Sequence, residues 1–339
     1  MKRATVDSTV EFRGPNLIQV SDASTAEVRP AECGSGIEFI VGKYRGSFGS
    51  DKERIPLNIR NIYARTWLGA RYAVLSSHQD KRLIGRWSDA EEGTHQVHVI
   101  EHFLSALHGA GITDATVLIN DLGHFGTDSI KACVPSTGPG IRDYFKELKK
   151  HKTEFYWRAK SLVAVKEDRY AHTDKKTGLR TKISVSPSKT LDINLLSAKH
   201  LDAIDLDEKG IHIKDTYAEL EKHVSAKALG RLKEWSKYLI WLSARKLPLI
   251  GYKGITEDNY TIVHPWSNTE SVVKQMRPQY RGGRNEHLYH TVFCDFLGEL
   301  YSFGSPDVKA KFELENTNHP TRIAALKQFE RRGVFKYTR

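Results

Sequence analysis

The spacing of apolar residues changes along one stretch of the chain, residues 97–121. Its first half predicts a helix with one buried face, because four apolar residues recur at helical spacing: Val99, Phe103, Ala106 and Leu107. Gly109 and Gly111 are expected to end this helix. The apolar run from Thr116 to Ile119 then predicts a buried strand. The stretch therefore indicates a short helix leading through a glycine turn into a sheet.

The rest of the chain mixes the two kinds of segment, which predicts a protein of both α and β structure. Strands are indicated over residues 25–30, 36–41, 72–75, 161–165, 182–185 and 191–195, and helices over 141–152, 215–241 and 286–304. A length of 339 residues suggests two domains. We expect the boundary at the basic run that ends the helix over 141–152, with domains at 1–145 and 153–339.

The net charge of +11 and the pI of about 9.4 favour an anionic partner. A nucleotide, a phosphate, a nucleic acid and an acidic membrane surface all fit, and a basic surface without a specific partner is the alternative. No apolar run reaches the ~18 residues of a transmembrane helix. The three cysteines, Cys33, Cys133 and Cys294, are far apart in sequence. A disulfide framework is therefore not expected, and a reducing cytoplasm is the natural location.

Candidate chemistry lies at the start of the first helix, where Glu101 directly precedes His102. On its own, such a pair is most often part of a solvated helix face. Here the neighbouring positions are apolar, and a strand is expected behind the helix. A catalytic base beside a metal ligand needs a rigid support of this kind, because both groups must be held in place to well under an ångström.

The order of these features resembles the zinc-dependent UDP-3-O-acyl-N-acetylglucosamine deacetylase family of lipid A synthesis. In that family a helix carries a catalytic Glu and a zinc-binding His, followed by an Ala-Leu pair, a glycine turn and an apolar strand. Further matching positions extend over most of the chain: Gly14, Arg29-Pro30, Gly36-Ile37, Asp295, Gly298-Glu299-Leu300 and His319.

The resemblance implies an α+β fold of two similar layered domains, each a sheet packed with helices, with the active site between them. It implies that Glu101 is the general base and that His102 and Asp295 are ligands of Zn²⁺. His319 would stabilise the intermediate or protonate the leaving amine, and Glu299 would orient it. The implied reaction removes an N-acyl group, most simply N-acetyl, from an amino sugar or a nucleotide-linked sugar. The implied substrate is thus a small anionic molecule.

One zinc ligand of the family is out of register in this chain. The family has a His four residues before the Asp, but Thr291 occupies that position here and His290 lies one residue earlier. A one-residue π-bulge would bring His290 onto the face of Asp295 and complete the site. Alternatively, His287 reaches the metal from two turns away, or His290 and Cys294 bind it together. The remaining alternative is that zinc has been lost.

Two other family features are missing. Ala228 stands where the family has the Thr that stabilises the oxyanion, and residues 135–138 replace its Asp-Gly-Ser motif. Losing one oxyanion donor typically costs about 10²–10³ in turnover. With the high charge, this supports an alternative function, a catalytically degenerate scaffold that binds nucleic acid or another anionic partner.

A second catalytic interpretation needs only five residues. The segment from His98 to His102 reads H-x-x-E-H, which is the inverted zinc-peptidase motif. That motif requires both histidines on one face of a single helix. We favour the deacetylase resemblance because it extends far beyond this segment.

Overall fold

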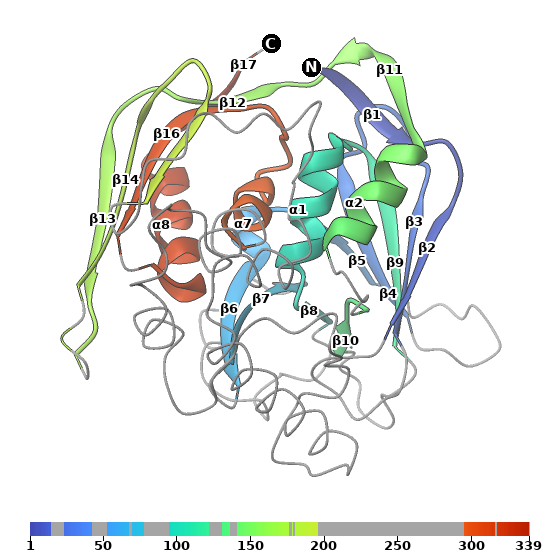
Figure 1. Ribbon diagram of the computed structural model, residues 1–339, viewed down its shortest axis with the longest axis horizontal. Coiled ribbons are helices and arrows are strands. Elements are labelled where there is room, and N and C mark those ends of the chain that lie inside the picture. Colours follow the sequence, from blue (N-terminus) through green and yellow to red (C-terminus); the bar gives the residue numbers. More distant parts are fainter. Residues whose placement is uncertain are drawn as a thin grey trace, which may run out of the picture.

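A computed structural model describes residues 1–14, 24–42, 53–67, 70–77, 95–121, 131–135, 141–175, 178, 180–195, 295–315 and 317–338. Within these ranges the chain forms four β-sheets and four α-helices (Figure 1). The α+β class expected from the sequence is confirmed. The division into domains at 1–145 and 153–339 stays a prediction, and the helix expected over 215–241 lies outside the described residues.

The first sheet has the strand order β2–β3–β9–β4–β5. Its strands are Val10–Gly14 (β2), Ser24–Arg29 (β3), Ala115–Asp121 (β9), Ile37–Gly42 (β4) and Glu53–Pro56 (β5). β9 lies between β3, to which it is antiparallel, and β4, to which it is parallel. Its consecutive residues Val117, Leu118 and Ile119 are all buried. A central strand of this kind explains why the sequence shows a continuous apolar run here instead of alternation.

The second sheet, β10–β8–β7–β6, supplies the support of the candidate site. Its strands are Lys131–Cys133 (β10), Gln96–His98 (β8), Ala70–Ser76 (β7) and Ile62–Trp67 (β6), and a 3-10 turn at Ile59–Asn61 precedes β6. Two residues, Val99 and Ile100, separate the end of β8 from the start of the first helix. The strand expected over 72–75 is confirmed within β7.

The third sheet has the order β13–β14–β16–β12–β17, and β15 also pairs with β16. Its strands are Asp168–Thr173 (β13), Arg180–Pro187 (β14), Val308–Glu315 (β16), Ser161–Ala164 (β12), Phe335–Thr338 (β17) and Leu191–Leu195 (β15). β1 (Lys2–Val6) and β11 (Lys152–Arg158) form a separate two-stranded sheet.

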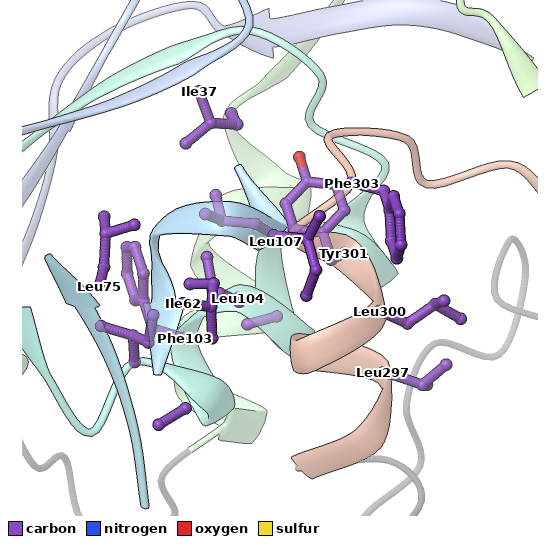
Figure 2. Packing of buried hydrophobic residues seen from close by; sticks show 14 of the residues in the cluster. Ile37, Ile62, Leu75, Phe103, Leu104, Leu107, Leu297, Leu300, Tyr301 and Phe303 are labelled. Atoms are coloured by element: carbon purple, nitrogen blue, oxygen red, sulfur yellow. The ribbon is translucent and has the colours of Figure 1, made fainter. Parts of the chain in front are cut away.

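The helices are Glu101–Ala110 (α1), Ile141–Lys150 (α2), Leu297–Tyr301 (α7) and His319–Arg331 (α8). α1 lies in the middle of the molecule and packs against α2 and α7, whereas α8 covers the β13–β14–β16 side and also contacts β6 (Figure 1). Figure 2 shows buried apolar side chains of α1 and α7, including Phe103, Leu104 and Leu107 of α1 and Leu300 of α7. Among the described residues, no helix is long and apolar enough to cross a membrane.

The ends of α1 agree in part with the sequence. Gly111 adopts the left-handed conformation with φ 69°, and the Ile112 N–H donates to the Leu107 carbonyl at 3.1 Å. This is a Schellman-type ending, in which a residue without Cβ is favoured. Gly109, by contrast, lies inside the helix, so the prediction that it also ends α1 was wrong. α2 is shorter than the expected 141–152, because β11 begins at Lys152.

Candidate active site

Glu101 is the first residue of α1, and its side chain is buried, with 3 % of the residue exposed. Its Oε2 accepts a hydrogen bond from the Ala73 N–H of β7 at 3.0 Å. The Ala73 carbonyl in turn accepts from the Val99 N–H at 3.0 Å. Ala73 of the second sheet thus binds both the Glu101 carboxylate and the backbone of Val99, which leads into α1.

Val99, which leads into α1, has a backbone conformation that costs free energy. Its φ is 56°, in the left-handed region that β-branched residues rarely adopt. Residues in such conformations cluster at functional sites, where the surrounding structure enforces them. Here the bend at Val99 turns the chain sharply from β8 into α1, which directs Glu101 back toward β7.

Burial raises the pKa of the Glu101 carboxyl above its usual value. The positive charge available on His319 and His102 opposes this shift, and the charge of Asp295 adds to it. A carboxylate with a raised pKa is a stronger base than one in water, which suits a group that accepts a proton near neutral pH.

Gly298 determines how closely α7 approaches α1. A Cβ at this position would lie 2.0 Å from the Glu101 carbonyl oxygen, so only glycine allows the two backbones to pack as they do. The contact brings Asp295 and Glu299, which lie on either side of Gly298 in sequence, next to the first turn of α1. Both acids are buried.

Asp295 lies between two imidazoles. His102 Nε2 is 3.5 Å from Asp295 Oδ1, and His319 Nε2 is 3.3 Å from Asp295 Oδ2. The His102 side chain is 29 % exposed, whereas the His319 side chain is 8 % exposed. The site is therefore buried on the side of His319 and reachable from the side of His102.

His319 occupies the first position of α8, directly before Pro320. The helix is capped by Asn318, whose side chain accepts from the Thr321 N–H at 3.1 Å, while Thr321 Oγ1 accepts from the Asn318 N–H at 3.0 Å. This capping box fixes the start of the helix. His319 therefore does not cap the helix, although its position before a proline would by itself suggest that role.

The His319 ring faces two carboxylates. Its Nδ1 lies 2.6 Å from Glu299 Oε1. Burial by itself would lower the pKa of His319, but the carboxylates of Asp295 and Glu299 outweigh it and hold the pKa above the usual value, although Arg322 opposes them. A protonated His319 is what an acid or electrostatic role requires.

Arg322 joins this cluster and was not among the residues selected from the sequence. It lies one helical turn after His319, it is 2 % exposed, and it donates to both Glu299 and Asp295. Arginine is usually a surface residue. The only sequence signal was its i+3 spacing from His319, which places both side chains on one face of α8.

Some predicted site residues lie outside the described residues. These are His290, the alternative ligands His287 and Cys294, and Ala228 at the oxyanion position. Asp295 and Phe296 have π-helical conformation directly before α7. The bulge expected between His290 and Asp295 and the role of His290 as third ligand stay predictions.

The structure corrects the interpretation of residues 98–102 as an inverted zinc-peptidase motif. His98 is the last residue of β8, and α1 begins at Glu101. The left-handed Val99 lies between them. His98 and His102 therefore do not share a helix, so the spacing that the motif requires for two ligands on one helical face is absent.

Two of the described side chains, those of His102 and Asp295, are spaced as two ligands of a shared metal ion would be. The 3.5 Å between His102 Nε2 and Asp295 Oδ1 is close to the roughly 3.3 Å that separates two ligands bound about 2.0–2.1 Å from a tetrahedral zinc ion. Within the described ranges no group of three or more His, Cys, Asp or Glu side chains is suited to hold a metal. The pair fits zinc and requires at least one further ligand.

Comparison with protein families gives a match over nearly the whole chain. The family model described as UDP-3-O-acyl N-acetylglycosamine deacetylase matches residues 3–330, nearly the whole chain. The search of curated proteins found no match.

Proposed function

The chain belongs to the UDP-3-O-acyl N-acetylglycosamine deacetylase family, and we propose that it hydrolyses the N-acetyl group of a nucleotide-linked amino sugar at a zinc site. The observation that carries the proposal is the convergence of Glu101, His102, Asp295 and His319 from three helical segments. These are the residue types that hydrolysis of an amide requires: a base, metal ligands and an acid.

His102 and Asp295 would hold the zinc ion, with His290 as the proposed third ligand. When bound, zinc supplies Lewis-acid chemistry, since it lowers the pKa of water and polarises a carbonyl. The 3.5 Å between the two described ligand atoms supports a shared metal. The second oxygen of Asp295 faces His319 and Arg322, as expected for a ligand carboxylate that is oriented by hydrogen bonds.

Glu101 would accept the proton of the attacking water. Its carboxylate is fixed by the Ala73 N–H, and its raised pKa favours proton acceptance. His319 would protonate the leaving nitrogen, so that acetate and a free amine result. Its bond to Glu299 would hold the imidazole in one orientation, with Nε2 as the atom that carries the transferred proton.

The anionic nucleotide portion of the substrate agrees with the net charge of +11. The alternative function, a degenerate scaffold that binds an anionic partner, would need none of the buried groups at the site. Keeping the Glu101 carboxyl buried is costly for a scaffold, because burial disfavours its charged form and raises its pKa.

Replacing Glu101 with Gln tests the proposed reaction. The amide keeps the shape and most of the hydrogen bonding but cannot accept the proton. We expect release of acetate from nucleotide-linked N-acetyl amino sugars to fall by about 10²–10⁴, with zinc content unchanged by elemental analysis.

Two controls define the outcome of this test. Glu147→Gln, at a solvated position of α2, should retain full activity, and His102→Ala should lose bound zinc while remaining folded. Full activity in Glu101→Gln would exclude it as the base. A zinc-loaded wild-type protein that is inert on free and nucleotide-linked sugars would support the scaffold instead.

A further inference from the structure

Arg322 is the largest fully buried side chain of the described residues, and none of the proposed chemical steps uses it. Its Nε donates to Glu299 Oε2 at 2.8 Å and its Nη2 to Glu299 Oε1 at 3.2 Å. The same Nη2 donates to Asp295 Oδ2 at 3.0 Å. One guanidinium thus donates to both carboxylate oxygens of Glu299, the acid that orients His319. It also donates to one oxygen of Asp295, the proposed zinc ligand.

The charge of Arg322 is largely compensated within this arrangement. Glu299 receives two hydrogen bonds in the bidentate geometry that matches a guanidinium to a carboxylate. The two groups together are neutral, so the Arg322–Glu299 pair adds little net charge to the site. Burying a charge costs several kcal/mol unless it is paired in good geometry. Arg322 meets that condition through Glu299.

The contacts of Asp295 divide between its two oxygens. Oδ2 faces both Arg322, at 3.0 Å, and His319, at 3.3 Å. Oδ1 is the oxygen nearest to His102 Nε2, at 3.5 Å. Because Arg322 holds Oδ2, the carboxylate cannot rotate freely, and Oδ1 stays directed toward His102.

We infer that Arg322 is the positioning residue of this site. It holds Glu299 against Nδ1 of His319, and it keeps Oδ1 of Asp295 directed toward His102 for metal binding. The inference rests on the proposed zinc-dependent function. It assigns to Arg322 a geometric task, which a point charge in the same place would not fulfil. Lysine has a flexible stem and a compact ammonium group, and it cannot bridge two oxygens of Glu299 and one of Asp295 in a fixed plane.

The test compares Arg322→Lys with wild-type protein and with Arg3→Lys. Arg3 makes the same bidentate contact with a buried carboxylate, that of Asp114, which adjoins the other end of α1. Each apoprotein is titrated with Zn²⁺ and with Co²⁺ against a chromogenic chelator, and the visible spectrum of the Co²⁺ form is recorded. We expect Arg322→Lys to bind both metals about 10–100-fold more weakly, with altered cobalt bands, and Arg3→Lys to match wild type.

A second variant covers the case in which Arg322→Lys does not fold. Glu299→Gln combined with Arg322→Gln removes both buried charges and keeps an amide pair. It should fold, as checked by its melting transition, and should also lose metal affinity. Wild-type affinity in either folded variant would overturn the inference alone. A wild-type apoprotein that binds neither metal would overturn the zinc-dependent function, and this inference with it.

Discussion

Just beyond the C-terminal end of α1, Asp114 accepts hydrogen bonds from the Arg3 side chain, the Thr113 hydroxyl and the backbone N–H groups of Gly34 and Gly36. At the N-terminal end, Asp295 and Glu299 share Arg322 and face the imidazoles of His102 and His319. Both clusters combine buried carboxylates with an arginine. They differ in the remaining partners, which are mainly backbone groups at one end and titratable rings at the other.

The difference separates a structural cluster from a reactive one. Burial by itself would raise the pKa of Asp114, but the hydrogen bonds from Arg3, Thr113 and Gly36 hold it below the usual value. Donors fixed in the backbone leave that carboxylate ionised and immobile. At the N-terminal end, Glu101 and His319 both have raised pKa values. Imidazole rings are able to exchange protons and to bind metals, whereas backbone donors are not.

The largest expected effect on stability comes from removing Asp114, the centre of the structural cluster. Asp114→Ala leaves the Arg3 guanidinium and the N–H groups of Gly34 and Gly36 without this acceptor. We expect the free energy of unfolding in urea to fall by about 3–5 kcal/mol. Metal affinity of the folded fraction should be unchanged, because the site lies at the other end of a ten-residue helix. A loss of metal affinity without a loss of stability would contradict this separation of the two ends.

Gly298→Ala disturbs the packing of α7 against the N-terminal end of α1, where the reactive cluster lies. The new Cβ would lie 2.0 Å from the Glu101 carbonyl oxygen. The Cβ is attached directly to one helical backbone and the oxygen belongs to another, so neither atom can rotate away. We expect α7 to shift and the protein to lose about 1–3 kcal/mol of stability. Metal affinity should fall as well, since Asp295 moves relative to His102. Gly304→Ala, where the added Cβ meets nothing, controls for the general effect of the substitution, although its φ of 75° adds some strain of its own.

His108 lies on α1 between the two clusters and provides a test by pH. It stacks on Tyr301 with the ring centroids 5.5 Å apart, and its Nε2 is 2.9 Å from the Pro306 carbonyl. Burial lowers the pKa of His108 from 6.5 to about 4, against the raising influence of the Pro306 carbonyl and Asp307.

Because the folded state favours neutral His108, the unfolded chain binds more protons between pH 6.5 and about 4. This contribution to stability is complete above pH 6.5 and declines as the pH falls toward 4. Between pH 6.5 and 5 the loss should be about 2 kcal/mol. His108→Gln should remove this part of the pH dependence in denaturation curves. If the free energy of unfolding of that variant depends on pH as in the wild type, other groups dominate the pH dependence.

The smallest expected effect concerns the strained entry to α1. Val99→Gly relieves a left-handed conformation that costs an L-residue roughly 1–2 kcal/mol, while it raises the entropy of the unfolded chain. These terms oppose each other, and we expect the free energy of unfolding to change by less than about 1 kcal/mol. Val99→Ala keeps the strain and serves as the comparison. A loss above 2 kcal/mol in the glycine variant would mean that packing of the Val99 side chain outweighs its strain.

Several parts of the fold followed from short-range patterns in the sequence. The helix at Glu101, its end at Gly111 and the buried strand after it were predicted, because helical spacing, a glycine and an apolar run act over a few residues. The same holds for the adjacency of Glu101 and His102. The roles of Asp295, Glu299 and His319 came from the family resemblance, and the structure brings these three side chains together.

Tertiary structure alone decided the rest. The alternative H-x-x-E-H interpretation placed His98 and His102 on one helix, whereas the pairing of β8 in the second sheet and the left-handed Val99 separate them. Arg322 is a charged helix residue that only the packing of α8 against α7 buries between two acids. The role of Gly298 depends likewise on a carbonyl 197 positions away in the chain. Contacts between such distant positions are set by how helices and sheets pack together, and local propensity carries no information about them.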